Sequence, residues 1–269
     1  MKKWALRIFL FFLLPTLMIG LNNQLTLTEY EISNSRIPEG FDGYRIAVVS
    51  DLHAKRFGDQ QQELIHMLQN SGCDLICILG DAVSKDTVDF SPLWEFVDGM
   101  SGTPMVYVAG NNELALKNYD EFLAGLVDRG VAVLDDMGET TLQVEHGADS
   151  ILIHGHPFRD SRQLSRHIEI AEKGFFNVLL YHDPYCFPEV ALFDYDLMLS
   201  GHTHGGVVRF PLVGSPMEWI AKEPYTKGIY TSRAATLIVS GGLGSHEILP
   251  RFFNSPEIVL ITLCASGNA

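Results

Sequence analysis

Apolar runs alternate with segments of helical periodicity along the first half of the chain. Four runs are apolar almost throughout, which is typical of strands that are buried on both faces. These predicted strands lie at 45–50, 74–80, 105–110 and 131–136. Between them, apolar positions recur at helical spacing at 59–72, 91–100 and 119–130.

The pattern changes after residue 136. Residues 140–147 and 150–157 predict a hairpin that turns around Gly147–Asp149, and a helix is expected near 161–173. The remaining apolar runs, at 176–183, 196–206, 226–244 and 255–263, are rich in strand-forming residues. β-α units followed by strands predict an α/β fold in which two packed sheets are flanked by helices.

The first 25 residues differ from the rest of the chain. Lys2, Lys3 and Arg7 precede a charge-free run from Ile8 to Leu21. This pattern indicates either an uncleaved membrane anchor, with a transmembrane helix at the short end of the usual range, or a cleaved secretory signal. A buried core helix is the third interpretation. Basic residues before the run predict an N-terminus in the cytoplasm and an exported domain at 26–269.

Composition narrows the function classes. A chain of 269 residues with 46% apolar residues is long enough for one large domain. Without Lys2, Lys3 and Arg7, the 19 basic residues fall to 16 against 33 acidic ones, and no basic stripe with interleaved aromatic residues is present. Nucleic acid is therefore a poor candidate partner. The four cysteines form no C-x-x-C pair and are interpreted as buried small hydrophobic residues; a disulfide framework is not expected.

Polar residues follow five of the predicted strands at the point where each strand ends. They are Asp51, His53, Asp81, Asn111, His182, His202 and His204. The carboxyl ends of parallel strands line the ligand crevice in open α/β sheets, so these residues are expected to converge. Any one of them alone is explained by capping or by a satisfied polar group, but capping does not call for histidine. The set predicts a metal site, and oxygen and imidazole ligands without thiolate suit Mn, Fe, Zn or Co.

The motifs D-x-H, G-D, G-N, H-D and G-H-T-H, in this order, resemble the calcineurin-like metallophosphoesterase superfamily. The stretches "LMLSGHTHGG", "GGLG" and "SPEIVLITL" are similar to its bacterial membrane-anchored or exported phosphodiesterase branch. The resemblance covers roughly residues 42–263 and implies a four-layer αββα fold. It also implies that Asp51, His53 and His204 hold one divalent ion, that Asn111, His182 and His202 hold a second, and that Asp81 bridges both.

Asn112 departs from this resemblance, because a histidine that contacts the phosphate or protonates the leaving group is usual at that position. Asparagine donates a hydrogen bond but cannot deliver a proton near neutral pH. Since general-acid catalysis is typically worth about 10²–10⁴-fold, its loss should slow turnover without abolishing it. His154 and His156, at the end of another apolar run, are alternative proton donors, and Arg56 is a candidate phosphate contact.

The sequence therefore predicts a dinuclear-metal-dependent phosphoesterase that cleaves phosphodiester, phosphomonoester or pyrophosphate bonds with metal-activated water. Membrane tethering of an acidic domain favours lipid-linked or cell-envelope phosphoesters, and places the catalytic domain outside the cytoplasm, or in the secreted fraction if the segment is cleaved. The alternative is a catalytically weak metal-bound domain that binds a phosphorylated envelope component or a protein.

Overall fold

Two six-stranded mixed β-sheets form the centre of the computed structural model, which describes residues 2–135, 138–159, 164, 166–244 and 250–266. In the order of the first sheet, the strands are β1 (Thr26–Asn34), β12 (Glu257–Ala265), β2 (Arg45–Val49), β3 (Leu75–Leu79), β4 (Met105–Val108) and β5 (Ala132–Val133). The second sheet runs β10 (Gly228–Ser232), β11 (Ala235–Val239), β9 (Leu197–Ser200), β8 (Asn177–Leu180), β7 (Asp149–Gly155) and β6 (Thr141–His146).

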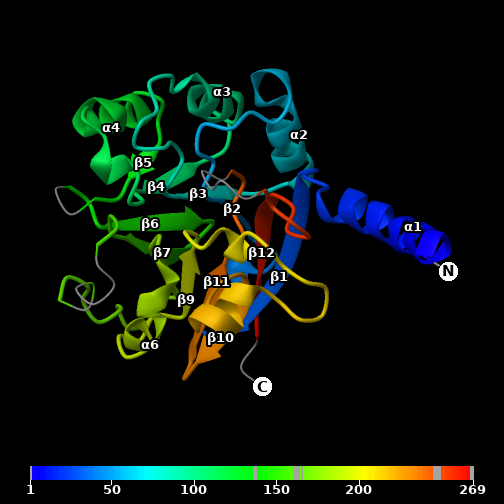
Figure 1. Ribbon diagram of the computed structural model, residues 1–269. Coiled ribbons are helices and arrows are strands. Elements are labelled where there is room, and N and C mark those ends of the chain that lie inside the picture. Colours follow the sequence, from blue (N-terminus) through cyan, green and yellow to red (C-terminus); the bar gives the residue numbers. More distant parts are fainter. Residues whose placement is uncertain (1, 136–137, 160–163, 165, 245–249, 267–269) are drawn as a thin grey trace.

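Helices cover the outer faces of the sheets (Figure 1). They are α2 (Gln62–Ser71), α3 (Ser91–Gly99) and α4 (Tyr119–Val127) on the first sheet and α6 (Phe187–Val190) on the second. The order of layers is helices, sheet, sheet, helix, which confirms the four-layer αββα fold expected from the sequence.

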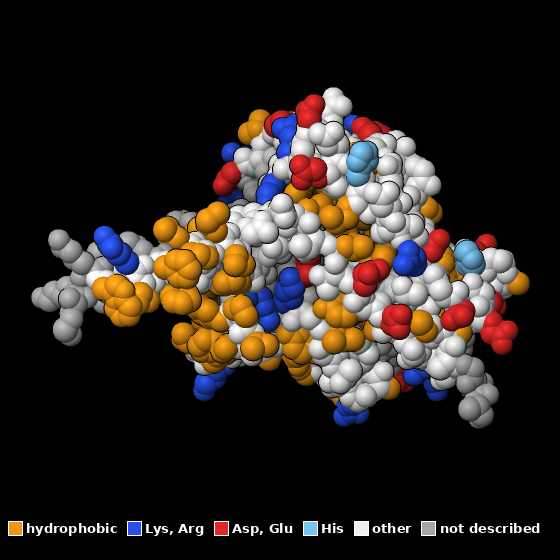
Figure 2. All heavy atoms as spheres, turned by 90° about the vertical axis from the view of Figure 1, so that its right-hand side faces the viewer, with side chains coloured by type: hydrophobic (Ala, Val, Ile, Leu, Met, Phe, Trp, Pro, Cys, Tyr) orange, Lys and Arg blue, Asp and Glu red, His pale blue; other side chains and the backbone are white. Residues whose placement is uncertain are grey.

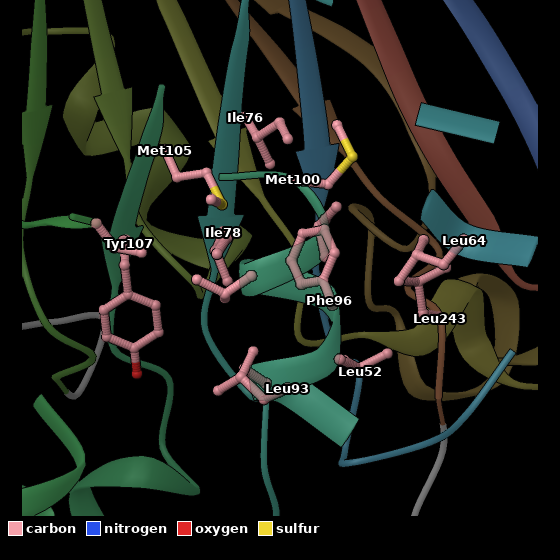
Figure 3. Packing of buried hydrophobic residues seen from close by; sticks show 14 of the residues in the cluster. Leu52, Leu64, Ile76, Ile78, Leu93, Phe96, Met100, Met105, Tyr107 and Leu243 are labelled. Carbon is pink, nitrogen blue, oxygen red and sulfur yellow. The ribbon is translucent and has the colours of Figure 1, made fainter. Parts of the chain in front are cut away.

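Alternating side chains of each strand enter different cores. In β2, Ile46 and Val48 enter the core between the sheets, while Ala47 and Val49 face the helices. Phe96 of α3 packs with Ile76 and other buried side chains on that helical side (Figure 3). Because both faces of the parallel strands are covered, these runs are apolar at every position.

The predicted strands and the hairpin β6–β7 are present. The strand β1 was not expected from the sequence, and it pairs in parallel with β12. The helix expected near 161–173 falls partly outside the described residues, and the described residues 166–173 contain a turn but no helix. The four cysteines are free thiols. Cys77 and Cys186 are buried, as predicted, whereas Cys73 and Cys264 are only half-buried, contrary to the expectation that all four are buried.

The N-terminal helix α1 (Lys2–Gly20) projects from the body (Figure 1). Within the described part of the chain, no helix is both long and apolar enough to cross a membrane, so the expected transmembrane helix is not supported. At about 1.5 Å per residue, the charge-free stretch from Ile8 to Gly20 covers only roughly 20 Å of a hydrocarbon layer of roughly 30 Å.

Candidate metal centre

The predicted ligands lie at the carboxyl ends of neighbouring strands. Asp51, Asp81 and Asn111 follow β2, β3 and β4, which are adjacent and parallel in the first sheet. His182 and His202 follow β8 and β9, which are adjacent and parallel in the second sheet. The two sheets pack against each other, so one end of the sandwich collects residues that are up to 153 positions apart in sequence, from Asp51 to His204.

Five of these residues have a left-handed backbone: Asp51 (φ 53°), His53 (φ 50°), Asp81 (φ 49°), His202 (φ 71°) and His204 (φ 50°). Such a conformation costs a non-glycine residue of order 1–3 kcal/mol, and it persists only where the surrounding structure imposes it. Other described residues, such as Gln60 and Leu212, also have a positive φ, but five of the seven predicted ligands share it, which indicates that the site imposes this backbone geometry.

The side chains form two groups. Asp51, His53 and His204 make one, and Asp81, His182 and His202 make the other; within each group the potential ligand atoms all lie within 4.8 Å of one another. The groups share a boundary, since Asp81 Oδ2 lies 3.9 Å from His53 Nε2 and 3.4 Å from His182 Nε2. Asp81 therefore faces both groups.

Hydrogen bonds on the far side of the imidazole rings orient the histidines. His182 Nδ1 lies 2.6 Å from the carbonyl oxygen of Leu79, and His53 Nδ1 lies 3.0 Å from Ser84 Oγ. His204 Nδ1 lies 3.3 Å from a backbone carbonyl. Each of these contacts leaves Nε2 directed at the carboxylates, which is the usual arrangement of metal-binding histidines in proteins.

Short hydrogen bonds also fix the two carboxylates. Ser50 Oγ donates to Asp51 Oδ2 over 2.6 Å, and the His202 amide donates to the same carboxylate at 3.1 and 3.2 Å. Asn112 donates to Asp81 twice, from its amide nitrogen to Oδ1 at 2.9 Å and from Nδ2 to Oδ2 at 2.6 Å. The carboxylates are thus held in place by Ser50 and Asn112, which belong to neither group, and by the backbone of His202, which belongs to the second.

Glu113 is a site residue that the sequence interpretation missed. Its buried carboxylate accepts hydrogen bonds from the amides of Asp81 at 2.9 Å, Val83 at 3.1 Å and Gly110 at 2.9 Å. It therefore fastens the loops that leave β3 and β4 to each other. The signal was available, because an acidic residue stands two positions after the predicted ligand Asn111.

Charge and burial act against each other at the site. Burial alone would raise the pKa of Asp51, but the nearby His204 and His182 lower it below its ordinary value. Burial alone would lower the pKa of His182, but the charges of Asp81 and Asp51 raise it to about 10. Burial lowers the pKa of His202. The site therefore favours ionised carboxylates, and their negative charge would attract cations to it.

The residues present fit a pair of divalent cations. Asn111 Oδ1 and His202 Nδ1 are buried and have no hydrogen-bond partner within the described residues. Buried polar atoms are nearly always paired, so an oxygen and a ring nitrogen left open beside two carboxylates indicate a cation. The imidazole, carboxylate and amide donors suit Mn, Fe, Zn or Co.

The other predicted residues lie away from the two groups. Ile151 and Ile153 point into the core between the sheets, so strand alternation places His154 on the outer face of β7. There His154 lies 3.0 Å from Asn177 Oδ1, and it lines, together with His156, a different pocket from that of the metal groups. The structure thus does not bring either histidine to the candidate centre, contrary to the expectation that one of them replaces the missing acid.

Arg56 is also occupied elsewhere. Its guanidinium is paired with Glu95, with Nη2 to Oε1 at 2.8 Å, and it donates to Ser91 Oγ at 2.7 Å. The side chain is exposed and is not among the residues that line the pocket of the metal groups. Its proposed contact with phosphate would require this pair to break.

A pocket of about 610 Å³ opens onto the site. Asp81, Asn111, His202 and His204 form its polar part. The remaining lining includes an apolar wall of Val207, Val208, Phe210, Pro216 and Met217. Three further polar residues, Tyr185, Thr203 and Glu223, also line the pocket. The cavity is therefore large enough for a small organic phosphate and offers it both polar and apolar contacts.

Gly201 allows close approach of the two sheets at the site. A Cβ added there would lie 2.6 Å from Asp51 Oδ2 and 2.9 Å from Ser50 Cβ. We expect Gly201→Ala to push the Asp51 carboxylate aside and to weaken Mn²⁺ binding by about 10–100-fold, as displacement of metal ligands does. Isothermal titration measures this change. Gly102→Ala is the control, because a Cβ there meets nothing within 4 Å; equal affinities for the two variants would contradict the assignment of Asp51.

Comparison with known proteins gives a concordant result. The family model described as calcineurin-like phosphoesterase matches residues 44–206. The chain is 28% identical over 255 residues to the uncharacterized metallophosphoesterase YkuE of Bacillus subtilis, which covers 90% of this chain and 86% of YkuE. It is 26% identical to YkoQ of the same organism, over 78% of this chain and 80% of YkoQ. It is 25% identical to the phosphodiesterase YaeI of Escherichia coli, over 82% of each chain.

Proposed function

Because the chain belongs to the calcineurin-like phosphoesterase family, and is thereby a metal-dependent phosphoester hydrolase, we propose that it cleaves phosphodiester, phosphomonoester or pyrophosphate bonds at a dinuclear centre. The observation that carries this proposal is the pair of adjoining groups of ligand atoms at the strand ends. Asp51, His53 and His204 would hold one ion. Asn111, His182 and His202 would hold the other, with Asp81 between them.

Two divalent ions at such a centre lower the pKa of a bound water and neutralise the phosphoryl oxygens. The protein itself holds the metal ligands in position. Leu79 and Ser84 orient histidines, Ser50 orients Asp51, and Glu113 joins the two loops that carry Asp81 and Asn111. Ligands that are already in place at the moment of reaction reduce the reorganisation that the transition state requires.

Asn112 is placed to support Asp81. Its amide group donates to Asp81 Oδ2 and its Oδ1 accepts from the Lys85 amide at 3.2 Å. We expect Asn112→Ala to lower the turnover of aryl and alkyl phosphodiesters by a similar factor of about 10-fold or more, the usual effect of losing a hydrogen bond to a charged group. A series of esters with leaving groups of different pKa measures this.

A loss that grows with the pKa of the leaving group would instead show that Asn112 acts on the leaving group, as its position in the family motif suggests. Asn118→Ala is the matched control, since Asn118 is exposed and its side chain makes no capping hydrogen bond.

We also propose that α1 attaches the chain to a membrane and that residues 26–269 form the catalytic domain outside the cytoplasm. Large apolar side chains of α1 are exposed, among them Phe11, Phe12 and Met18. An uncovered helix of this composition is unfavourable in water and favourable in lipid. Fractionation of cells that express the full chain, with protease applied from outside, tests the location.

The direct test of the activity is hydrolysis of bis-p-nitrophenyl phosphate by the full chain with added Mn²⁺, over a range of pH. Release of p-nitrophenol that requires the metal is the expected result. Metal retention without turnover above background would favour the alternative function, a metal-bound domain that binds a phosphorylated ligand.

A further inference from the structure

Large apolar side chains are exposed on two segments of this protein, α1 and residues 207–221. On α1, Trp4 is 73% and Met18 is 77% exposed. On the second segment, Leu212 is fully exposed, Ile220 is 78% and Trp219 is 49% exposed. Figure 2 shows apolar side chains gathered along the projecting helix and on the body beside it. We call these two segments together the apolar face.

Phe252 and Phe253 connect the two segments. The Phe253 amide donates to the carbonyl of Gly20 at the end of α1, over 2.6 Å. The neighbouring Phe252 forms a bridge with Val208, and its carbonyl accepts from the Arg209 amide at 2.9 Å. Both segments therefore lie on one side of the molecule, as Figure 1 also shows for the blue helix and the yellow loop after β9.

Charge distinguishes the apolar face from the rest of the protein. The chain carries a formal net charge of −14, yet its first acidic residue is Glu29, so α1 has basic residues and no acidic ones. Arg7 is exposed on the face, and Lys222, directly after its second segment, is exposed as well. The acidic residues in 207–223 are both half-buried: Glu218 pairs with Arg209 at 3.2 Å, and Glu223 follows Lys222. The exposed charges beside the apolar residues are thus basic, which matches a lipid surface with anionic headgroups.

The positions of the tryptophans also indicate a lipid surface as the partner. The chain has three tryptophans, and two of them, Trp4 and Trp219, are exposed on the apolar face. The amphipathic indole ring favours the level of the headgroups in a bilayer. A water-exposed surface has no comparable reason to collect tryptophan.

The metal pocket opens at the apolar face. Phe210 and Met217 belong to the second segment and also line the pocket whose polar part includes Asp81, His202 and His204. A molecule that spans this pocket would place a phosphate at the carboxylates and histidines and an apolar group against Val207, Val208 and Phe210. That combination is the chemistry of an amphiphilic phosphoester.

From these observations we propose that the apolar face binds an anionic lipid surface and that the pocket takes from it a phosphoester with a long apolar chain. The substrate part of this inference rests on the proposed phosphoesterase function; lipid binding does not. Within residues 207–221, the exposed Leu212, Trp219 and Ile220 are a second lipid contact beside α1. The pocket-lining Val207, Val208 and Phe210 are the wall that selects the substrate tail.

Fluorescence of Trp219 tests lipid binding without any use of activity. In the full chain with Trp4→Phe and Trp94→Phe, emission from Trp219 should be quenched by vesicles of brominated phosphatidylcholine with phosphatidylglycerol. The control chain keeps only Trp94, which lies under α4 in contact with Phe122, and should be unaffected. Equal Trp219 emission with brominated and plain vesicles would overturn the inference and would leave a protein partner as the occupant of the face.

Two substrates with the same leaving group test the pocket. We expect p-nitrophenyl hexadecyl phosphate in vesicles to be hydrolysed with a kcat/KM at least about tenfold above that of p-nitrophenyl ethyl phosphate, since burial of a single large apolar group is worth about this factor. The triple variant Leu212→Ser, Trp219→Ser, Ile220→Ser should lose this preference and keep its rate on the ethyl ester.

The matched control changes three residues that are similarly exposed elsewhere, Val127→Ser, Ile170→Ser and Leu192→Ser, and should keep the preference. Equal rates of the wild-type chain on both esters would overturn the substrate part and leave the proposed function intact. Hydrolysis of neither ester would contradict the proposed function itself, and the Trp219 measurement would still decide whether the face binds lipid.

Discussion

Asp81→Asn is expected to lower metal-dependent hydrolysis of bis-p-nitrophenyl phosphate by at least about 1,000-fold, because one carboxylate faces both groups of ligands. Loss of a residue that only orients a ligand typically costs 10–100-fold. Asp81 Oδ2 is within 3.9 Å of His53 Nε2 and within 3.4 Å of His182 Nε2, so its loss weakens both ion sites together. Steady-state rates at saturating Mn²⁺ measure the effect.

The unfolding midpoint of Asp81→Asn in the presence of a chelator tests whether its loss of activity is due to misfolding. The Asp81 charge repels Asp51 but is attracted by His182. Burial alone would raise the pKa of Asp81, but His182 lowers it below its ordinary value, so the ionised carboxylate is net stabilising in the chelated protein. The chelated variant should therefore still unfold cooperatively, at a lower temperature than the chelated wild type. Asp128→Ala, at an exposed position after α4, should retain full activity. Activity of Asp81→Asn within about tenfold of the wild type would remove Asp81 from the centre.

The second large effect concerns stability. We expect Mn²⁺ at 100–1,000 times its dissociation constant to raise the unfolding midpoint by roughly 5–15 °C over the chelated protein, since binding to the native state alone is worth about 3–4 kcal/mol under those conditions. The centre is buried and charged, and five of its residues have a left-handed backbone. A bound cation offsets both the carboxylate repulsion and the strain. Differential scanning calorimetry with and without chelator measures the shift.

The shift should be largely absent in Asp81→Asn and Asp51→Asn, and present in Asp128→Ala. A midpoint that does not respond to the metal in the wild-type chain, at concentrations that support hydrolysis, would mean that the ions bind the unfolded chain equally well or lie elsewhere. Mg²⁺ is a useful comparison, because imidazole-rich sites suit it less than Mn²⁺.

The structure brings the residues singled out from the sequence to one end of the sheets because a strand end is a local feature with a fixed spatial meaning. Asp51, Asp81 and Asn111 follow apolar runs typical of buried parallel strands, and such strands end on the same side. The same strand-end argument brought His182 and His202 to them, whereas the division of the ligands between two ions came from the resemblance to a known family. The distances between His182 and the carboxylates lie beyond sequence reasoning, since they depend on how two sheets pack.

Sequence analysis missed or misplaced other features for identifiable physical reasons. The strand β1 carries polar residues at alternating positions, because it lies at the edge of its sheet, and it lacks the apolar run that marked the others. His154 and His156 resemble the ligand histidines in sequence, but their strand presents them to the outer face. Glu113 was not singled out from the sequence, because its role as the acceptor of three backbone amides depends on how the loops after β3 and β4 meet. In each case the role of the residue depends on which face of the strand it occupies or on how the loop turns. Residue type alone shows neither.

Whether the seven residues hold a pair of cations is decided by metal analysis of the purified full chain, after loading with Mn²⁺ and removal of free ion. Two ions per chain are expected in the wild type. Asp81→Asn and a double variant, His53→Ala with His182→Ala, should both retain fewer than one. A wild-type chain that holds no tightly bound ion, or a double variant that still holds two, would contradict the assignment of these residues to a pair of cation sites.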